Sequence, residues 1–119
     1  RRASLAGTRR AVPEADAAAA LFAFRRWRDE SGQAIDAARA GLAVPASPAP
    51  TLVMASRADE DVPFAVSATL ATTLNAAFLP LPGSHVAPLL GHAAADAAGQ
   101  AVAWLRGGAL KAFDTDPSG

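Results

Sequence analysis

The chain has no cysteine, no excess of either charge and no long apolar run, and each absence excludes a class of protein. Without cysteine there is no disulfide framework, no thiolate nucleophile and no sulfur-ligated zinc site. Lysine plus arginine number 11 and aspartate plus glutamate number 11, so no net field favours nucleic acid as a partner. The longest apolar stretch, residues 17–24, is far below the roughly 20 residues needed to cross a bilayer, so no membrane span is expected.

What remains is the composition of a soluble globular protein. The chain has 119 residues, 51% of them hydrophobic and 18% charged, which is enough for one compact domain and too little for two. Arg1 and Arg2 suggest a twin-arginine export signal, but Thr8, Arg9 and Arg10 interrupt any apolar region behind them. The sequence does not determine the compartment, and the cytoplasm is favoured over export.

The first part of the chain is expected to be helical. Residues 1–12 form a basic N-terminal segment. A helix over 13–30 is predicted because Pro13 opens the pattern, acidic residues follow it, and arginines crowd its end before Gly32, which would be its C-cap. A shorter helix over 33–40 would end at Gly41. Residues 13–43 therefore form a helical segment.

A proline-rich linker over 44–50 separates this segment from a region of different character, residues 51–108. The apolar run 51–55 is typical of a strand buried on both faces of a parallel sheet, and residues 77–81 indicate a second strand, weakened by Pro80.

Helices are expected over 63–75 and 92–106, with a loop over 83–91 between the second strand and the last helix. In the first of these helices Val66, Leu70 and Leu74 would form the buried face. A loosely held tail over 109–119 would follow. The order strand, helix, strand, helix predicts an α/β fold with a parallel sheet.

Polar residues follow both expected strands at the point where each strand ends. Asp59 and Asp61 come after the first strand, and His85 comes after the second. Because the carboxyl ends of parallel strands lie on one rim of a sheet, a carboxylate and an imidazole would meet there. Such a carboxylate fixes the tautomer of the histidine, which can then act as a general base near neutral pH.

These segments resemble the last catalytic segments of the α/β-hydrolase family. Pro50-Thr-Leu-Val-Met-Ala-Ser is similar to its proline-led buried strand, and Asp59 stands four residues before Pro63, as the triad acid of that family does. Leu79-Pro-Leu-Pro-Gly-Ser-His85 is similar to the turn that presents its catalytic histidine. The one local departure is Ser56, where the family usually has glycine.

The resemblance implies that 51–108 is the C-terminal part of an α/β-hydrolase core and that 13–43 is similar to its cap. The family's Gly-x-Ser-x-Gly nucleophile elbow is absent, as is its oxyanion segment. A second polypeptide would therefore complete the sheet and supply the nucleophile. The implied activity is hydrolysis of ester-like bonds in a small molecule, as in carboxylesterases, lipases and thioesterases, without cofactor or metal. Dehalogenases and epoxide hydrolases share the acid and histidine loops but use an aspartate nucleophile.

Several alternatives stay open. Asp61 is the reserve acid, although it is also placed to cap the helix that starts near Pro63. Phe24 and Trp27 are most simply core residues, and in a cap they could line the substrate pocket. Ser84 adjoins His85, but neighbours on a turn generally point apart. The competing hypothesis is a non-catalytic helical interaction module in which Asp59 and His85 have no joint role.

Overall fold

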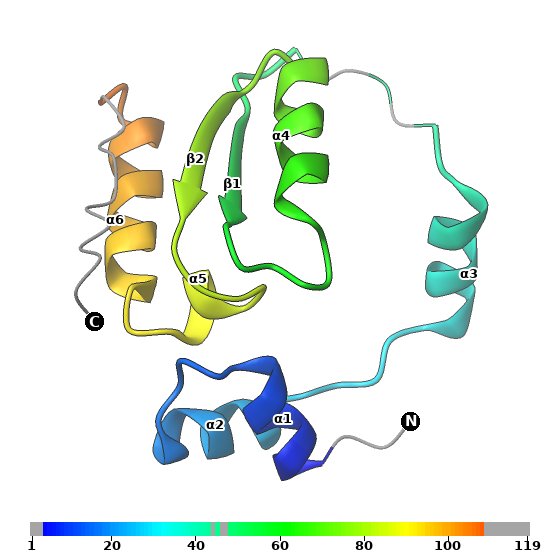
Figure 1. The fold of residues 1–119 in the computed structure, drawn as a ribbon. Helices are drawn as coiled ribbons and strands as arrows, with labels where there is room; N and C mark the ends of the chain where they lie inside the picture. The colour runs from blue at the N-terminus through cyan, green and yellow to red at the C-terminus, as the bar shows by residue number, and fades with distance from the viewer. Residues whose placement is uncertain (1–3, 44, 46–47, 109–119) are drawn as a thin grey trace.

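The computed structural model describes residues 4–43, 45 and 48–108, so the expected tail at 109–119 and part of the expected linker lie outside it. The described residues form a small mixed α/β arrangement with six helices and two parallel strands (Figure 1). Among these residues, no helix combines the length and apolarity that crossing a membrane requires.

The two predicted strands pair in parallel, as expected. β1 (Leu52–Ser56) lies beside β2 (Ala77–Leu81), in a register that runs from Leu52 opposite Ala77 to Ser56 opposite Leu81. The crossover between them contains α4 (Phe64–Thr73), which packs mainly on β1. Parallel strands require such a crossover, and the two strands consequently end at the same rim.

A helix covers each face of this narrow sheet. Leu79 and Leu81 of β2 form the buried core with Ala97 of α6 (Ala94–Leu105). Side chains alternate between the faces of a strand, so Phe78 points the other way, where its ring lies 5.4 Å from that of Phe64 at the start of α4. Figure 1 shows α4 and α6 on opposite sides of the strands.

The stretch expected to be a loop, 83–91, contains a short helix, α5 (Ala87–Leu90). Pro88 stands at its start, where the missing N–H group of proline has no intrahelical partner to lose. The glycine, serine and proline residues of this stretch are typical of loops, so the sequence pattern did not indicate a helix there.

The basic N-terminal segment contains a helix that was not predicted from the sequence. α1 (Leu5–Ala11) begins at Ser4, whose side chain accepts a hydrogen bond from Gly7 N at 3.0 Å. Its only buried side chain is Thr8, whose hydroxyl accepts a hydrogen bond from the indole N–H of Trp27 at 2.8 Å. This contact between distant residues fixes α1 and could not be read from local sequence.

The single helix predicted over 13–30 is wrong. α2 (Ala17–Phe24) begins after Asp16, whose carboxylate caps Ala19 N at 2.8 Å, and it ends where the chain turns to bring Trp27 back to α1. α3 (Gly32–Ala40) follows, so Gly32 is its first residue and not the C-cap of the preceding helix. No residue of α3 is buried, and Gly41 ends it as predicted, with φ of 85°.

The predicted buried face of α4 is also wrong. Val66, Leu70 and Leu74 are 56%, 49% and 39% exposed, whereas Ala71 is buried. The helix turns its small residues toward the sheet, because two strands are too narrow to cover a second row of side chains. The three side chains form an apolar stripe, called the α4 stripe below, that the described residues leave uncovered.

The two outer edges of the sheet differ. Thr51 O accepts from Ala77 N, and Arg57 N donates to Leu81 O, so the odd-numbered residues of both strands bond within the pair. Pro80 therefore directs its backbone to the outer edge of β2, where it has no N–H group to offer. The free edge of β1 keeps its donors. The Ser56 hydroxyl at the end of that strand is buried and has no hydrogen-bond partner among the described residues.

Candidate active site

The loops that follow β1 and β2 run side by side at the carboxyl rim of the sheet. Ala58 N donates to Gly83 O at 3.1 Å, which extends the backbone pairing beyond the strands. The predicted acid, Asp59, comes from the first loop and the predicted histidine, His85, from the second. Helices α1 and α2 lie beyond the same rim (Figure 1).

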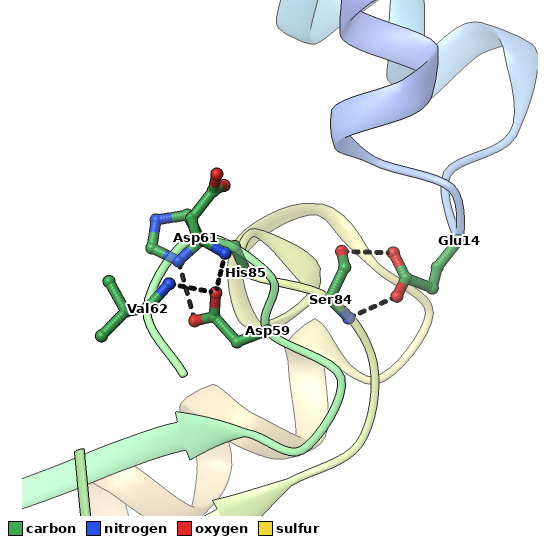
Figure 2. A network of polar contacts seen from close by, with 6 residues as sticks. All are labelled: Glu14, Asp59, Asp61, Val62, Ser84 and His85. Atoms are coloured by element: carbon green, nitrogen blue, oxygen red, sulfur yellow. Dashed lines mark hydrogen bonds and ion pairs between the residues drawn. The ribbon is translucent and has the colours of Figure 1, made fainter. Parts of the chain in front are cut away.

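The structure brings Asp59 and His85 into direct contact. Nδ1 of His85 lies 2.8 Å from Oδ2 of Asp59. The other carboxylate oxygen of Asp59, Oδ1, accepts hydrogen bonds from the backbone N–H groups of Asp61 at 2.9 Å and Val62 at 2.8 Å. Figure 2 shows the carboxylate held between these groups, with the far nitrogen of the imidazole ring pointing away from it. The acid is fixed by its own loop and in turn orients the histidine.

This network shifts both titrations. Burial alone would raise the pKa of Asp59, but hydrogen bonds from Val62 N–H, the His85 ring and Asp61 N–H outweigh it, so the pKa lies below its ordinary value. The hydrogen bond that His85 donates to the Asp59 carboxylate raises the pKa of His85, against a smaller opposing effect of burial. Both shifts favour a carboxylate paired with an imidazolium.

Exposure differs sharply within the pair. The Asp59 side chain is 10% exposed and that of His85 is 45% exposed. The carboxylate thus has little contact with solvent while the outer edge of the imidazole stays accessible. This is the arrangement that a general base requires, because the catalytic nitrogen must reach a proton on another group.

A cavity of about 540 Å³ opens beside His85. Its walls come from α1, the turn between α1 and α2, and the two rim loops. The lining residues are Gly7, Arg10, Ala11, Pro13, Glu14, Ala58, Glu60, Asp61, Ser84 and His85. Its volume is in the range of small-molecule sites.

The reserve acid, Asp61, occupies a different position from Asp59. Its backbone N–H group serves Asp59, and its exposed carboxylate acts on His85 only through its charge. Nor does it cap α4, because Pro63 holds the N-cap position and no side chain bonds there. The structure therefore pairs the histidine with Asp59.

Three side chains at the rim have the spacing of a possible metal site. One donor atom from each of Asp59, Asp61 and His85 lies within 4.8 Å of the others, a spacing that can hold an ion. Both oxygens of Asp59 already accept hydrogen bonds, from His85 and from its own loop. An ion would have to compete with all three, so the arrangement fits a hydrogen-bonded pair better than a ligand set.

The expected pocket residues lie elsewhere. Trp27 donates its indole N–H group to Thr8 and lines a separate hollow of about 450 Å³ with Arg25, Arg26 and Arg28. Neither Trp27 nor Phe24 lines the cavity beside His85. The long helix predicted over 13–30 would have placed them on one continuous face, and the turn after Phe24 removes that face.

Sequence reasoning missed Glu14, which bonds to the residue before His85. The hydroxyl of Ser84 donates to Glu14 Oε2 at 2.8 Å, and the backbone N–H of Ser84 donates to Glu14 Oε1 (Figure 2). Burial alone would raise the pKa of Glu14, but the bonds from Ser84 and its own backbone hold it below the ordinary value. The partners are 70 residues apart, so no local pattern could have revealed them.

The cavity, the paired side chains and Glu14 make up the candidate site that this chain presents. No protein-family model, curated protein or solved structure matches the chain.

Proposed function

We propose that this chain supplies the general-base histidine and the orienting acid of an α/β-hydrolase-type active site for ester-like bonds. The nucleophile would come from a polypeptide segment outside these 119 residues. The observation that carries the proposal is the 2.8 Å contact between His85 Nδ1 and Asp59 Oδ2 at the carboxyl rim of two parallel strands. The resemblance of both loops to the acid and histidine segments of that family points the same way.

In the proposed reaction, Asp59 accepts the Nδ1 proton of His85 in a hydrogen bond and leaves Nε2 unprotonated. Nε2 takes the proton of the nucleophile's hydroxyl group as its oxygen bonds to the carbonyl carbon of the substrate. The same proton then passes to the leaving oxygen as the ester bond breaks. A water molecule repeats the sequence and releases the acid. Asp59 stabilises the imidazolium in both halves.

The chain's own serines do not suit the role of nucleophile. Ser84, the serine nearest to His85, donates its hydroxyl to Glu14, so that proton already has an acceptor other than the imidazole. The sequence has no Gly-x-Ser-x-Gly turn to expose a serine at a strand end. An external nucleophile is therefore part of the proposal, and aspartate in place of serine would give a related hydrolase.

Three features support a sheet that continues beyond the described strands. The α4 stripe is uncovered, the free edge of β1 keeps its hydrogen-bond donors, and the Ser56 hydroxyl is buried without a partner. Pro80 makes the edge of β2 unsuitable for a further strand. The missing strands are thus expected next to β1, which would carry the nucleophile toward the same rim.

The test uses a tagged version of this chain, expressed in its native cells and isolated together with any polypeptide bound to it. The tagged chain is purified, treated with a fluorophosphonate and measured by intact mass. The proposal expects the label on a polypeptide segment outside residues 1–119. His85→Ala should lower ester turnover by at least about 10³-fold, as loss of a triad histidine does.

His92→Ala is the matched control, since His92 is an exposed histidine outside the cavity. Equal turnover by the two variants would contradict the catalytic assignment. If the fluorophosphonate labels nothing, but a dehalogenase or epoxide hydrolase substrate is turned over, the nucleophile is aspartate and not serine.

A second candidate is a non-catalytic helical interaction module. The observation that favours it is α3, in which every residue is exposed and which packs closely against no other described element. This function predicts a stable monomer that a fluorophosphonate does not label and that does not hydrolyse esters. The intact-mass experiment separates the two candidates directly.

A further inference from the structure

Glu14 connects two parts of the molecule that otherwise touch little. It lies in the turn between α1 and α2, and its carboxylate accepts two hydrogen bonds from Ser84, one from the hydroxyl and one from the backbone. Ser84 directly precedes His85. A side chain that fixes Ser84 through both groups also limits how the next residue can turn.

The helix pair α1–α2, residues 5–24, has few other attachments to the rest of the chain. α1 and α2 pack against each other, and Trp27, shortly after the end of α2, bonds to Thr8 of α1. Neither helix packs extensively against the strands or against α4, α5 and α6. The cavity beside His85 nevertheless has one wall from this pair and the other from the rim loops. The contact made by Glu14 therefore holds the two walls together.

The turn itself is shaped to accept this carboxylate. Gly83 has φ of 85°, a conformation that favours glycine, and a Cβ atom there would lie 2.9 Å from Glu14 Oε1 and 2.6 Å from Ala87 Cβ. A side chain at position 83 would push Glu14 away from Ser84. The missing side chain at Gly83 thus leaves room for the Glu14 carboxylate beside Ser84.

We propose that Glu14 is a positioning residue that holds the α1–α2 pair over the rim and fixes the turn presenting His85. Its effect on turnover rests on the proposed function, whereas the contact and its effect on the histidine do not. Glu14 is expected to act through Ser84 and not to touch substrate.

Two variants of Glu14 separate the effect of its hydrogen bonds from the effect of its charge. Four charged residues line the cavity with His85, namely Arg10, Glu14, Glu60 and Asp61, and Asp59 bonds to the His85 ring. Glu14→Ala removes both the charge and the hydrogen bonds. Glu14→Gln removes only the charge, because its amide can still accept from the backbone of Ser84 and bond to the hydroxyl. The matched control is Asp16→Asn, which removes a charge two residues away and keeps the N-cap of α2.

Two readouts on the full chain test the proposal. Hydrogen exchange over residues 5–24 should quicken about tenfold in Glu14→Ala, because this variant loses both hydrogen bonds to Ser84, with β1 and β2 unchanged. The pKa of His85, followed by NMR of its ring, should fall toward 6.5 in Glu14→Ala. Glu14→Gln should resemble the natural chain in both readouts, and so should Asp16→Asn.

Three outcomes would overturn the proposal. Exchange in Glu14→Ala could match Asp16→Asn, it could quicken equally in the strands, or Glu14→Gln could lower the pKa of His85 as much as Glu14→Ala. Ser84→Ala, which keeps the backbone bond, should give an intermediate exchange rate and checks the contact from its other side. None of these readouts involves turnover, so a chain without hydrolase activity could still pass them.

Discussion

His85 and Asp59 are 26 residues apart in sequence, yet their side chains meet at 2.8 Å. The reason is the pairing of the strands before them, which the backbone bond from Ala58 N to Gly83 O extends into both loops. Asp59 is held by its own loop, so it presents one oxygen to the imidazole in a fixed direction. The geometry is a property of the paired strands and their loops.

The first prediction concerns the titration of His85. Its hydrogen bond to Asp59 raises the pKa of the imidazole above 6.5, so the NMR midpoint of the ring should lie above that value. Asp59→Asn should bring it back down, because an amide offers no charge to the imidazolium. If His85 is the general base of the proposed hydrolase, turnover should rise with pH through the raised pKa, since the base must be unprotonated. A midpoint that Asp59→Asn leaves unchanged would contradict the pairing.

The same shifts set the pH range in which the pair stabilises the fold. The raised pKa of His85 gives a contribution that is complete below pH 6.5 and is lost as pH rises through the folded-state value. The lowered pKa of Asp59 gives one that is present above pH 3.8 and is lost as pH falls through its folded-state value. Urea midpoints should therefore show the pair's largest contribution between pH 3.8 and 6.5, and Asp59→Asn should flatten this dependence.

The second prediction decides between the two acids of the loop. Asp59→Asn keeps an oxygen for the backbone N–H groups but cannot hold the imidazole as a carboxylate does. Turnover should fall by about 10⁴-fold, the scale observed for a triad acid. Asp61→Asn should change turnover only a few-fold, because its carboxylate acts on His85 through charge alone. The opposite ranking in kcat/KM would make Asp61 the acid.

Much of this site follows from sequence, because strand ends in a parallel sheet place their loops on one rim. The periodicity of residues 51–81 predicted both strands and the helix between them, and Asp59 and His85 were placed correctly as neighbours. The two apolar runs are short, are bounded by turn formers or charged residues and are separated by a stretch of helical length, which together favour two parallel strands joined by a helix.

The N-terminal part could not be predicted in the same way. The contact of Trp27 with Thr8 and that of Glu14 with Ser84 join distant residues, so each overrides what local pattern suggests. The prediction that the α4 stripe is buried was wrong for a different reason. Its spacing is typical of a buried face, but burial requires a covering surface, and the described residues offer none.

The third prediction concerns Gly83, whose φ of 85° and close neighbours leave no room for a side chain. Gly83→Ala should lower the free energy of unfolding by about 1–3 kcal/mol, the cost of a strained backbone position. Gly99→Ala is the control, because Gly99 lies inside α6 with nothing within 4 Å of an added Cβ atom. It should be neutral or stabilise by up to about 1 kcal/mol. Urea unfolding measures both, and an equal effect of the two variants would contradict the strain at Gly83.

The last prediction uses the α4 stripe to test whether the sheet continues. Leu70 is 49% exposed, so Leu70→Asp should change the stability of the isolated chain little. If the proposed nucleophile-bearing segment covers the stripe, the same variant buries an unpaired charge.

Association should then weaken by about 3 kcal/mol, roughly a hundredfold. Thr72→Asp is the control, since Thr72 is exposed on the other flank of α4 and its hydroxyl bonds only within the helix. The measurement is the amount of fluorophosphonate-labelled polypeptide retained by each tagged variant. Equal retention by the two variants would contradict docking of the labelled polypeptide on the α4 stripe. Retention that depends on Leu70 would instead show that the labelled polypeptide docks on α4, next to β1 and the rim that carries His85.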